Sequence, residues 1–75
     1  MQEYKDLSGN SGVTRYGCGN DYIDIEFRGE KIYRYDYTKP GEVHVEKMKQ
    51  LALSGEDLAT YINQNVRKNF AAQLK

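Results

Sequence analysis

Two short stretches of alternating polar and apolar residues, separated by a glycine turn, constrain the fold of this chain most. They cover residues 22–28 and 32–37, with Gly29 between them. At every second position they carry an apolar or aromatic residue: Ile23, Ile25, Phe27, Tyr33, Tyr35 and Tyr37. Because successive side chains of a strand point to opposite faces, each set lines one face. The two stretches therefore predict a β-hairpin with an apolar face.

The register of this hairpin decides where the tyrosine rings lie. With a three-residue turn the tyrosines share a face with the aliphatic residues, and Glu26 lies opposite Arg34 on the other face. That register pairs Phe27 with Tyr33, Ile25 with Tyr35 and Ile23 with Tyr37. A two-residue turn would instead leave the tyrosines beside Asp24 and Glu26. The first register buries more apolar surface, so we expect the tyrosine row to line the core.

The rest of the chain completes an α+β pattern. A first strand is expected over residues 11–16, and the turn-forming residues 17–21 join it to the hairpin. After Pro40 the apolar spacing becomes helical, around Val45 and again from Leu58 onward. The stripe expected on the second helix comprises Leu58, Tyr61, Ile62, Val66, Phe70 and Leu74. The pattern predicts a three-stranded antiparallel sheet followed by two helices packed on one face.

The domain boundaries follow from the same pattern. Residues 1–10 are polar and are expected to form a flexible N-terminal lead, which leaves residues 11–75 as a single domain. Ser54 and Gly55 interrupt the helical spacing, and Ser54 is placed to cap the second helix.

Composition argues against several classes of protein. A chain of 75 residues accommodates one small domain. Its 11 basic residues balance 11 acidic ones, whereas nucleic-acid-binding proteins that act mainly by neutralising phosphates usually carry a basic excess or a basic stripe. Cys18 is the only cysteine, so an internal disulfide is excluded. No apolar run approaches the ~20 residues of a membrane span, and no secretory signal opens the chain. We expect a cytoplasmic protein without a membrane partner.

The sequence offers no catalytic or metal-binding set. His44 is the only histidine, and no serine or cysteine can be paired with it from sequence. Cys18 lies in a glycine-rich turn without a neighbouring base, so a thiol-dependent enzyme is the remotest alternative. One histidine and one cysteine do not make a typical zinc site. We expect no enzyme activity, no metal and no small-molecule cofactor.

Two polar residues of the second helix are the best candidates for a binding site. Asn63 and Arg67 are four residues apart and therefore lie on one helical face. In one interpretation Arg67 covers the core and Asn63 holds a neighbouring loop. In the other, they frame a small polar groove together with the hydroxyls of Tyr33 and Tyr35.

The order of these motifs resembles the KTSC domain, a short bacterial module that also occurs at the C-terminus of some lysyl-tRNA synthetases. The matching residues are Ser11, Val13, Tyr16, Gly17, Ile23, Ile25, Phe27, Gly29, Tyr33-Arg34-Tyr35, Pro40, Ser54-Gly55, Asn63, Val66, Arg67 and Phe70. The resemblance covers residues 11–70. It implies a domain of unknown function, with RNA binding suggested by the synthetase association.

The sequence therefore favours a small non-enzymatic binding module. We expect a protein-interaction or accessory domain, because a neutral mixed surface is typical of protein contacts. RNA binding, related to tRNA by the family association, is the alternative. Both hairpin registers argue against it, since one turns the tyrosine rings inward and the other sets them beside acids. The candidate binding residues are Tyr33, Tyr35, Asn63 and Arg67.

Overall fold

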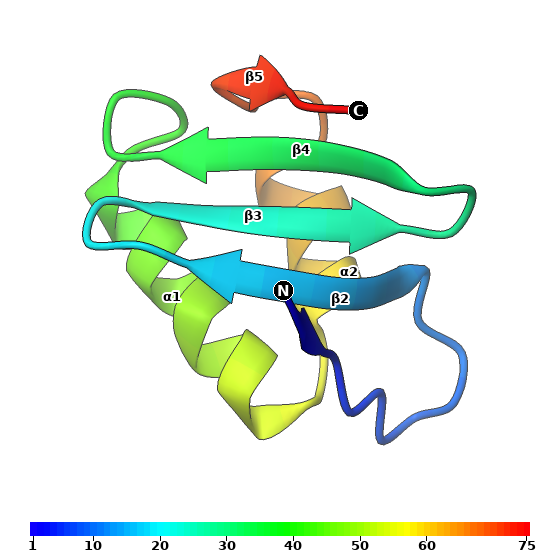
Figure 1. The fold of residues 1–75 in the computed structure, drawn as a ribbon. Coiled ribbons are helices and arrows are strands. Elements are labelled where there is room, and N and C mark those ends of the chain that lie inside the picture. The colour runs from blue at the N-terminus through cyan, green and yellow to red at the C-terminus, as the bar shows by residue number, and fades with distance from the viewer.

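The fold is an antiparallel sheet with helical segments on one of its faces (Figure 1). The computed structural model describes residues 1–75. Its elements are β1 (Gln2–Glu3), β2 (Val13–Cys18), β3 (Tyr22–Phe27), β4 (Lys31–Asp36), α1 (Glu42–Ser54), α2 (Leu58–Tyr61), the π-helical turn η1 (Ile62–Val66) and β5 (Ala72–Gln73). Neither α1 nor the shorter helical segments combine the length and hydrophobicity needed to cross a membrane. The predicted α+β class and antiparallel sheet are confirmed.

The sheet is wider than the sequence predicts. Strands β2, β3 and β4 are the three expected strands, and they lie side by side in chain order. Two short strands extend the sheet at its edges: β1 pairs with β2, and β5 pairs with β4. The prediction of three strands is therefore incomplete, because two-residue strands carry no periodic signal.

The hairpin register differs from the expected one by two residues. Phe27 lies opposite Lys31, not Tyr33, and Ile25 lies opposite Tyr33. The predicted pairing is thus wrong in its offset. A shift of two residues nevertheless keeps every side chain on its expected face. The tyrosines therefore share a face with the aliphatic residues of β3, as expected.

The turn between β3 and β4 explains the offset. It comprises Arg28, Gly29 and Glu30, and the Glu30 amide donates a hydrogen bond to the carbonyl of Phe27 at 3.1 Å. Gly29 and Glu30 both have positive φ, at 86° and 65°. A left-handed conformation suits glycine at no steric cost, whereas Glu30 adopts it less readily. Lys31 is consequently the first residue of β4 and not part of the turn.

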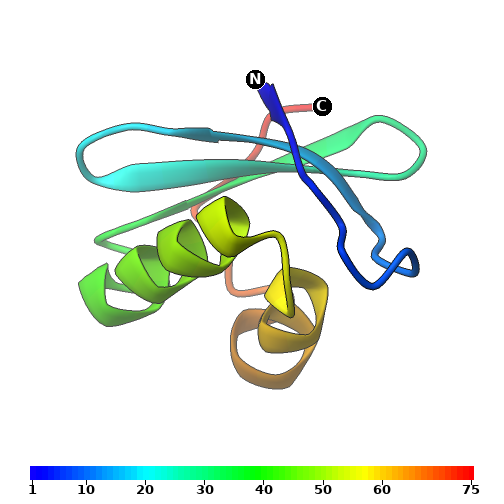
Figure 2. The ribbon, with the colours of Figure 1, turned by 90° about the horizontal axis from the view of Figure 1, so that it is seen from below.

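The core lies between the sheet and the helices, which cover one face only (Figure 2). Tyr35 occupies its middle with 1 % of its surface exposed, while Tyr33 and Tyr37 are half-buried at either side. The buried apolar residues are Tyr4, Val13, Tyr16, Ile23, Ile25, Tyr35, Val45, Met48, Ala52, Leu58, Ile62 and Val66. The tyrosine row therefore lies on the face of the sheet that packs against the helices, which is the face that the sequence predicts.

The first ten residues contribute to the fold. Residues 2–3 form β1, and Tyr4 is buried with 6 % of its surface exposed. The amide of Leu58 donates a hydrogen bond to the Tyr4 hydroxyl at 3.3 Å. The amide of Leu7 donates to the carbonyl of Gly55 at 2.9 Å. The segment expected as a lead thus contacts the connection between α1 and α2.

The second helical region is shorter than its apolar stripe predicts. Ser54 ends α1, and its hydroxyl donates to the Leu51 carbonyl at 2.9 Å, so it does not cap α2. Helical structure ends at Val66, and the chain then reverses through Arg67. Phe70 therefore lies outside any helix, although its spacing fits one. The prediction of a helix through residue 74 is wrong.

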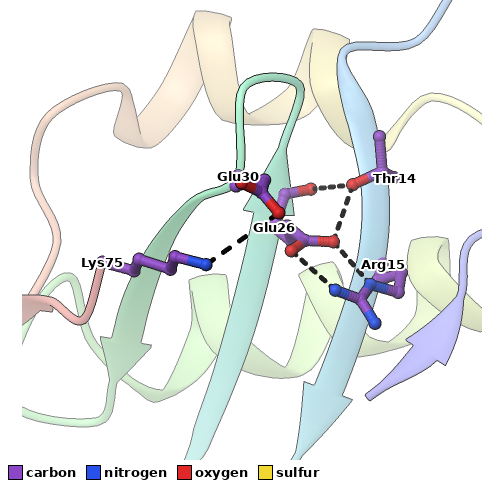
Figure 3. A network of polar contacts seen from close by, with 5 residues as sticks. All are labelled: Thr14, Arg15, Glu26, Glu30 and Lys75. Carbon is purple, nitrogen blue, oxygen red and sulfur yellow. Dashed lines mark hydrogen bonds and ion pairs between the residues drawn. The ribbon is translucent and has the colours of Figure 1, made fainter.

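The open face of the sheet carries ion pairs that neutralise its charges. Glu26 is almost buried there, and the Nε and Nη2 atoms of Arg15 donate to its carboxylate at 2.5 and 2.8 Å (Figure 3). The Thr14 hydroxyl also donates to this carboxylate at 3.1 Å. In the same way Arg34 donates to both carboxylate oxygens of Asp24, at 2.8 and 2.9 Å. Both arginines are thus paired with carboxylates of the same face through two-point hydrogen bonds.

Replacement of Glu26 by glutamine is expected to change the acid stability of the fold. The Arg15 guanidinium, assisted by the Thr14 hydroxyl, lowers the pKa of Glu26 from its ordinary 4.5 to about 2. The carboxylate therefore stabilises the fold above pH 4.5, and this contribution is lost as the pH falls toward 2. Urea unfolding across this pH range should show a lower free energy of unfolding for Glu26→Gln at neutral pH and a flatter pH dependence.

A matched control is Glu56→Gln, at an exposed acid without an ion pair. Asp36 and Glu46 also have lowered pKa values, and they contribute equally to the pH dependence of stability in the wild type and in both variants. Unchanged pH dependence in Glu26→Gln would contradict the assigned role of the Arg15 pair.

Candidate functional site

A cleft of about 460 Å³ opens between the end of the sheet and the last helical turn. Its volume lies within the range of roughly 300–1,000 Å³ that is typical of ligand sites. The residues that line it are Phe27, Lys31, Tyr33, Tyr35, Ile62, Asn63, Arg67, Lys68, Phe70 and Gln73. They come from β3, β4, η1, β5 and the segment between η1 and β5. The site therefore depends on the chain returning to the sheet after the helices.

Aromatic rings form the apolar wall of the cleft. The ring of Phe70 packs against that of Tyr33 with 4.6 Å between centroids, and it meets Tyr35 edge-on at 6.3 Å. Phe27 meets the other side of this group, with its centroid 5.8 Å from Tyr33. Such tilted and edge-on arrangements are favourable for aromatic pairs. Phe70 thereby links the C-terminal segment to the tyrosine row.

A buried hydrogen bond shapes the turn that carries Arg67. The Tyr35 hydroxyl donates to the Arg67 carbonyl at 3.2 Å. Burial raises the pKa of Tyr35 to about 12, so the phenol stays protonated and remains a donor. Arg67 itself has φ 35° and ψ −108°, a sparsely populated conformation, and its amide closes the π-helical turn on the carbonyl of Ile62 at 2.6 Å. Strained residues and π-helical turns both concentrate at functional sites.

The charge at the cleft is uniformly positive. Lys31, Arg67 and Lys68 line it, and no acidic residue does. All three side chains are exposed and none forms an ion pair. By contrast, Arg15 and Arg34 on the open sheet face are both paired. Although the net charge of the chain is zero, the cleft therefore carries three positive charges.

The amide side chains of Asn63 and Gln73 supply neutral polar groups to the cleft. Each offers donors and an acceptor that can bond a peptide group or a base edge. Asn63 also borders a second, polar cavity of about 390 Å³, which is lined by Tyr4, Ser8, Asn10, Ser11, Gly12, Asp57, Leu58, Ala59, Thr60 and Asn63. That cavity contains no cationic side chain, so the two sites differ in character.

The structure brings all four candidate residues to one cleft. Tyr33, Tyr35, Asn63 and Arg67 line it together, although their role in binding stays a prediction. The groove interpretation of Asn63 and Arg67 is the one that this geometry favours. The cleft residues not named as candidates are Phe27, Lys31, Ile62, Lys68, Phe70 and Gln73.

For some of these residues the sequence contains a pattern that could have identified them. Lys31 precedes Tyr33 by two positions, and alternation alone places both on one face. Phe70 could not be found in this way, because its spacing assigned it to the helical stripe. Gln73 likewise reaches the cleft only through β5, which the sequence does not predict.

The residues considered for catalysis lie elsewhere. Nδ1 of His44 is 2.7 Å from the Tyr61 hydroxyl, in a contact between α1 and α2. Local desolvation raises the pKa of the Cys18 thiol more than Lys49 lowers it, which is opposite to the shift of an activated thiolate. No three His, Cys, Asp or Glu side chains gather in a group that could hold a metal ion.

Removal of the Tyr35 hydroxyl is expected to weaken the fold. Tyr35→Phe leaves the ring in the core but deprives the Arg67 carbonyl of its donor, which should lower the free energy of unfolding by about 1 kcal/mol. Tyr33→Phe is the matched control, because the Tyr33 hydroxyl makes no hydrogen bond within the chain. Urea unfolding of the two variants checks this, and equal stabilities would contradict the role of the bond.

Comparison of the chain with protein-family models, curated proteins and solved structures gives no match.

Proposed function

We propose that this chain is a small non-enzymatic binding module that meets a protein partner through the cleft, as an interaction or accessory domain. The observation that carries the proposal is the convergence of Lys31, Arg67 and Lys68 on a wall of aromatic rings. An apolar centre with a charged rim is the usual anatomy of a protein-binding site. Arg and aromatic residues are also the types that contribute most to such contacts.

The contrast between the two faces of the sheet supports the choice of the cleft. On the open face the charges of Arg15, Glu26, Asp24 and Arg34 satisfy one another. A partner would have to compete with these internal pairs for the same charged groups. At the cleft the cations are exposed and unpaired, so a partner can pair with them without that competition.

RNA binding is the second candidate function. It is favoured by one observation, the presence of three unpaired cations beside Tyr33 and Phe70, since RNA modules combine positive charge with aromatic stacking. Against it, the rings of Tyr33 and Phe70 pack on each other at 4.6 Å and so cover part of the faces on which bases would stack. The neutral total charge also provides little long-range attraction for phosphate.

Membership of the KTSC family is part of this proposal. Its support is the ordered set of matching residues between Ser11 and Phe70, together with the meeting of Tyr33, Tyr35 and Arg67 at one cleft.

A non-catalytic role and a reducing cytoplasmic setting fit the environment of Cys18. It is a free thiol in an exposed position, which a reducing compartment keeps unoxidised. Desolvation raises the pKa of this thiol above its ordinary value, whereas a nucleophilic cysteine has a lowered pKa.

Selection from a displayed peptide library tests the proposed function. The cleft variant is Lys31→Glu with Lys68→Glu, and the control is Lys39→Glu with Lys47→Glu, which changes the net charge equally at exposed lysines outside the cleft. Peptides selected on the wild type should bind the control with similar affinity and the cleft variant at least about tenfold more weakly, since charge reversal repels a complementary partner. Circular dichroism verifies that both variants are folded.

Two results would contradict the proposal. Selected peptides that bind the cleft variant as well as the wild type would show that the cleft is not the binding site. A parallel selection of random single-stranded RNA that alone yields cleft-dependent ligands would replace the protein partner with RNA.

A further inference from the structure

The chemistry of the cleft restricts the class of partner. Its only charged residues are Lys31, Arg67 and Lys68, all positive and all without an internal counter-ion. A basic or neutral segment bound here would leave three cations uncompensated at the edge of a partly desolvated site. Charge complementarity therefore calls for an acidic ligand.

The wall of the cleft indicates what accompanies the acidic groups. Phe27, Tyr33 and Phe70 present a continuous apolar surface, and Ile62 extends it toward η1. Because Tyr33 and Phe70 pack on each other, the wall is better suited to edge-on contact with a ring or to an aliphatic side chain than to flat stacking. Burial of one such side chain would stabilise the complex by the ordinary hydrophobic effect.

The amides of Asn63 and Gln73 complete the match to a peptide. Both side chains lie at the cleft, and neither is buried. A carboxamide bonds a backbone peptide group through one donor and one acceptor, which suits an extended chain passing over the site. The three cations, the apolar wall and the two amides can therefore all contact a single ligand, an acidic peptide with an apolar side chain.

Resting on the function proposed above, we propose that the cleft binds an extended acidic peptide segment that packs one aromatic or large aliphatic side chain against the wall formed by Phe27, Tyr33 and Phe70. Aspartate or glutamate residues on either side of this apolar residue bond Lys31, Arg67 and Lys68. The peptide backbone lies against Asn63 and Gln73. The partner is thus an acidic linear segment of another protein and not a nucleic acid.

Titration of the isotope-labelled protein with synthetic peptides tests this inference by nuclear magnetic resonance. The test peptide carries one phenylalanine flanked on each side by aspartate and glutamate. One control peptide has alanine in place of the phenylalanine, and another has asparagine and glutamine in place of the acids. A short oligouridylate of equal negative charge provides the nucleic-acid comparison. Each titration is repeated at increasing salt.

We expect the acidic phenylalanine peptide to shift the amide signals of Lys31, Tyr33 and Arg67. Each control peptide should bind at least about tenfold more weakly, and affinity should fall as salt screens the charges. The cleft variant with Lys31→Glu and Lys68→Glu should lose binding to the same extent, whereas the variant with Lys39→Glu and Lys47→Glu should retain it.

The outcomes separate this inference from the function on which it rests. Equal binding of the uncharged peptide, or cleft shifts caused by oligouridylate alone, would overturn the acidic-peptide inference. A peptide of another composition, selected from a library and dependent on the cleft, would overturn it too while leaving the protein-binding function in place. If no selected peptide and no RNA depended on the cleft, both would fall.

Discussion

The hydrogen bond from the Tyr35 hydroxyl to the Arg67 carbonyl joins the middle of the sheet to the end of the helical region. Around this bond the backbone leaves helical geometry at Val66 and turns back toward β4. The reversal places Phe70 on the tyrosine row and β5 at the edge of the sheet. The cleft is the space that remains beside this turn, so its shape depends on a buried phenol that faces the core and not the solvent.

The distribution of charge gives the cleft its character. Overall neutrality results from 11 basic and 11 acidic residues, but the two kinds are not mixed evenly in space. On the open face Arg15 and Arg34 form two-point contacts with carboxylates, and such contacts are the strongest ion pairs that a surface can form. Near the cleft, Lys31, Arg67 and Lys68 have no such partners. Function is therefore better judged from the local charge than from the total.

The sequence predicts which face of the sheet a side chain occupies better than it predicts the strand register or the ends of helices and strands. Alternation determines which face Tyr33 and Tyr35 occupy, and a register error of two residues leaves that face unchanged. The offset itself depends on the positive φ of Glu30, which side-chain pattern does not reveal. Phe70 satisfies helical spacing and tertiary packing equally well, so periodicity extends the helix too far. The pairing of β1 with β2 and of β5 with β4 depends on contacts between residues distant in sequence. Each of these strands also has only two residues, which are too few to show a period.

The most direct test of this account is the set of proton–proton contacts that Phe70 makes in solution, measured by nuclear magnetic resonance. The structure requires contacts between the rings of Phe70 and Tyr33, whose centroids are 4.6 Å apart, and between Phe70 and Tyr35. It also requires an interruption of helical contacts after Val66. Observation of both would support the turn, the aromatic wall and the cleft together. Continuous helical contacts through Phe70, without any to Tyr33, would contradict the account, because the cleft would then not form.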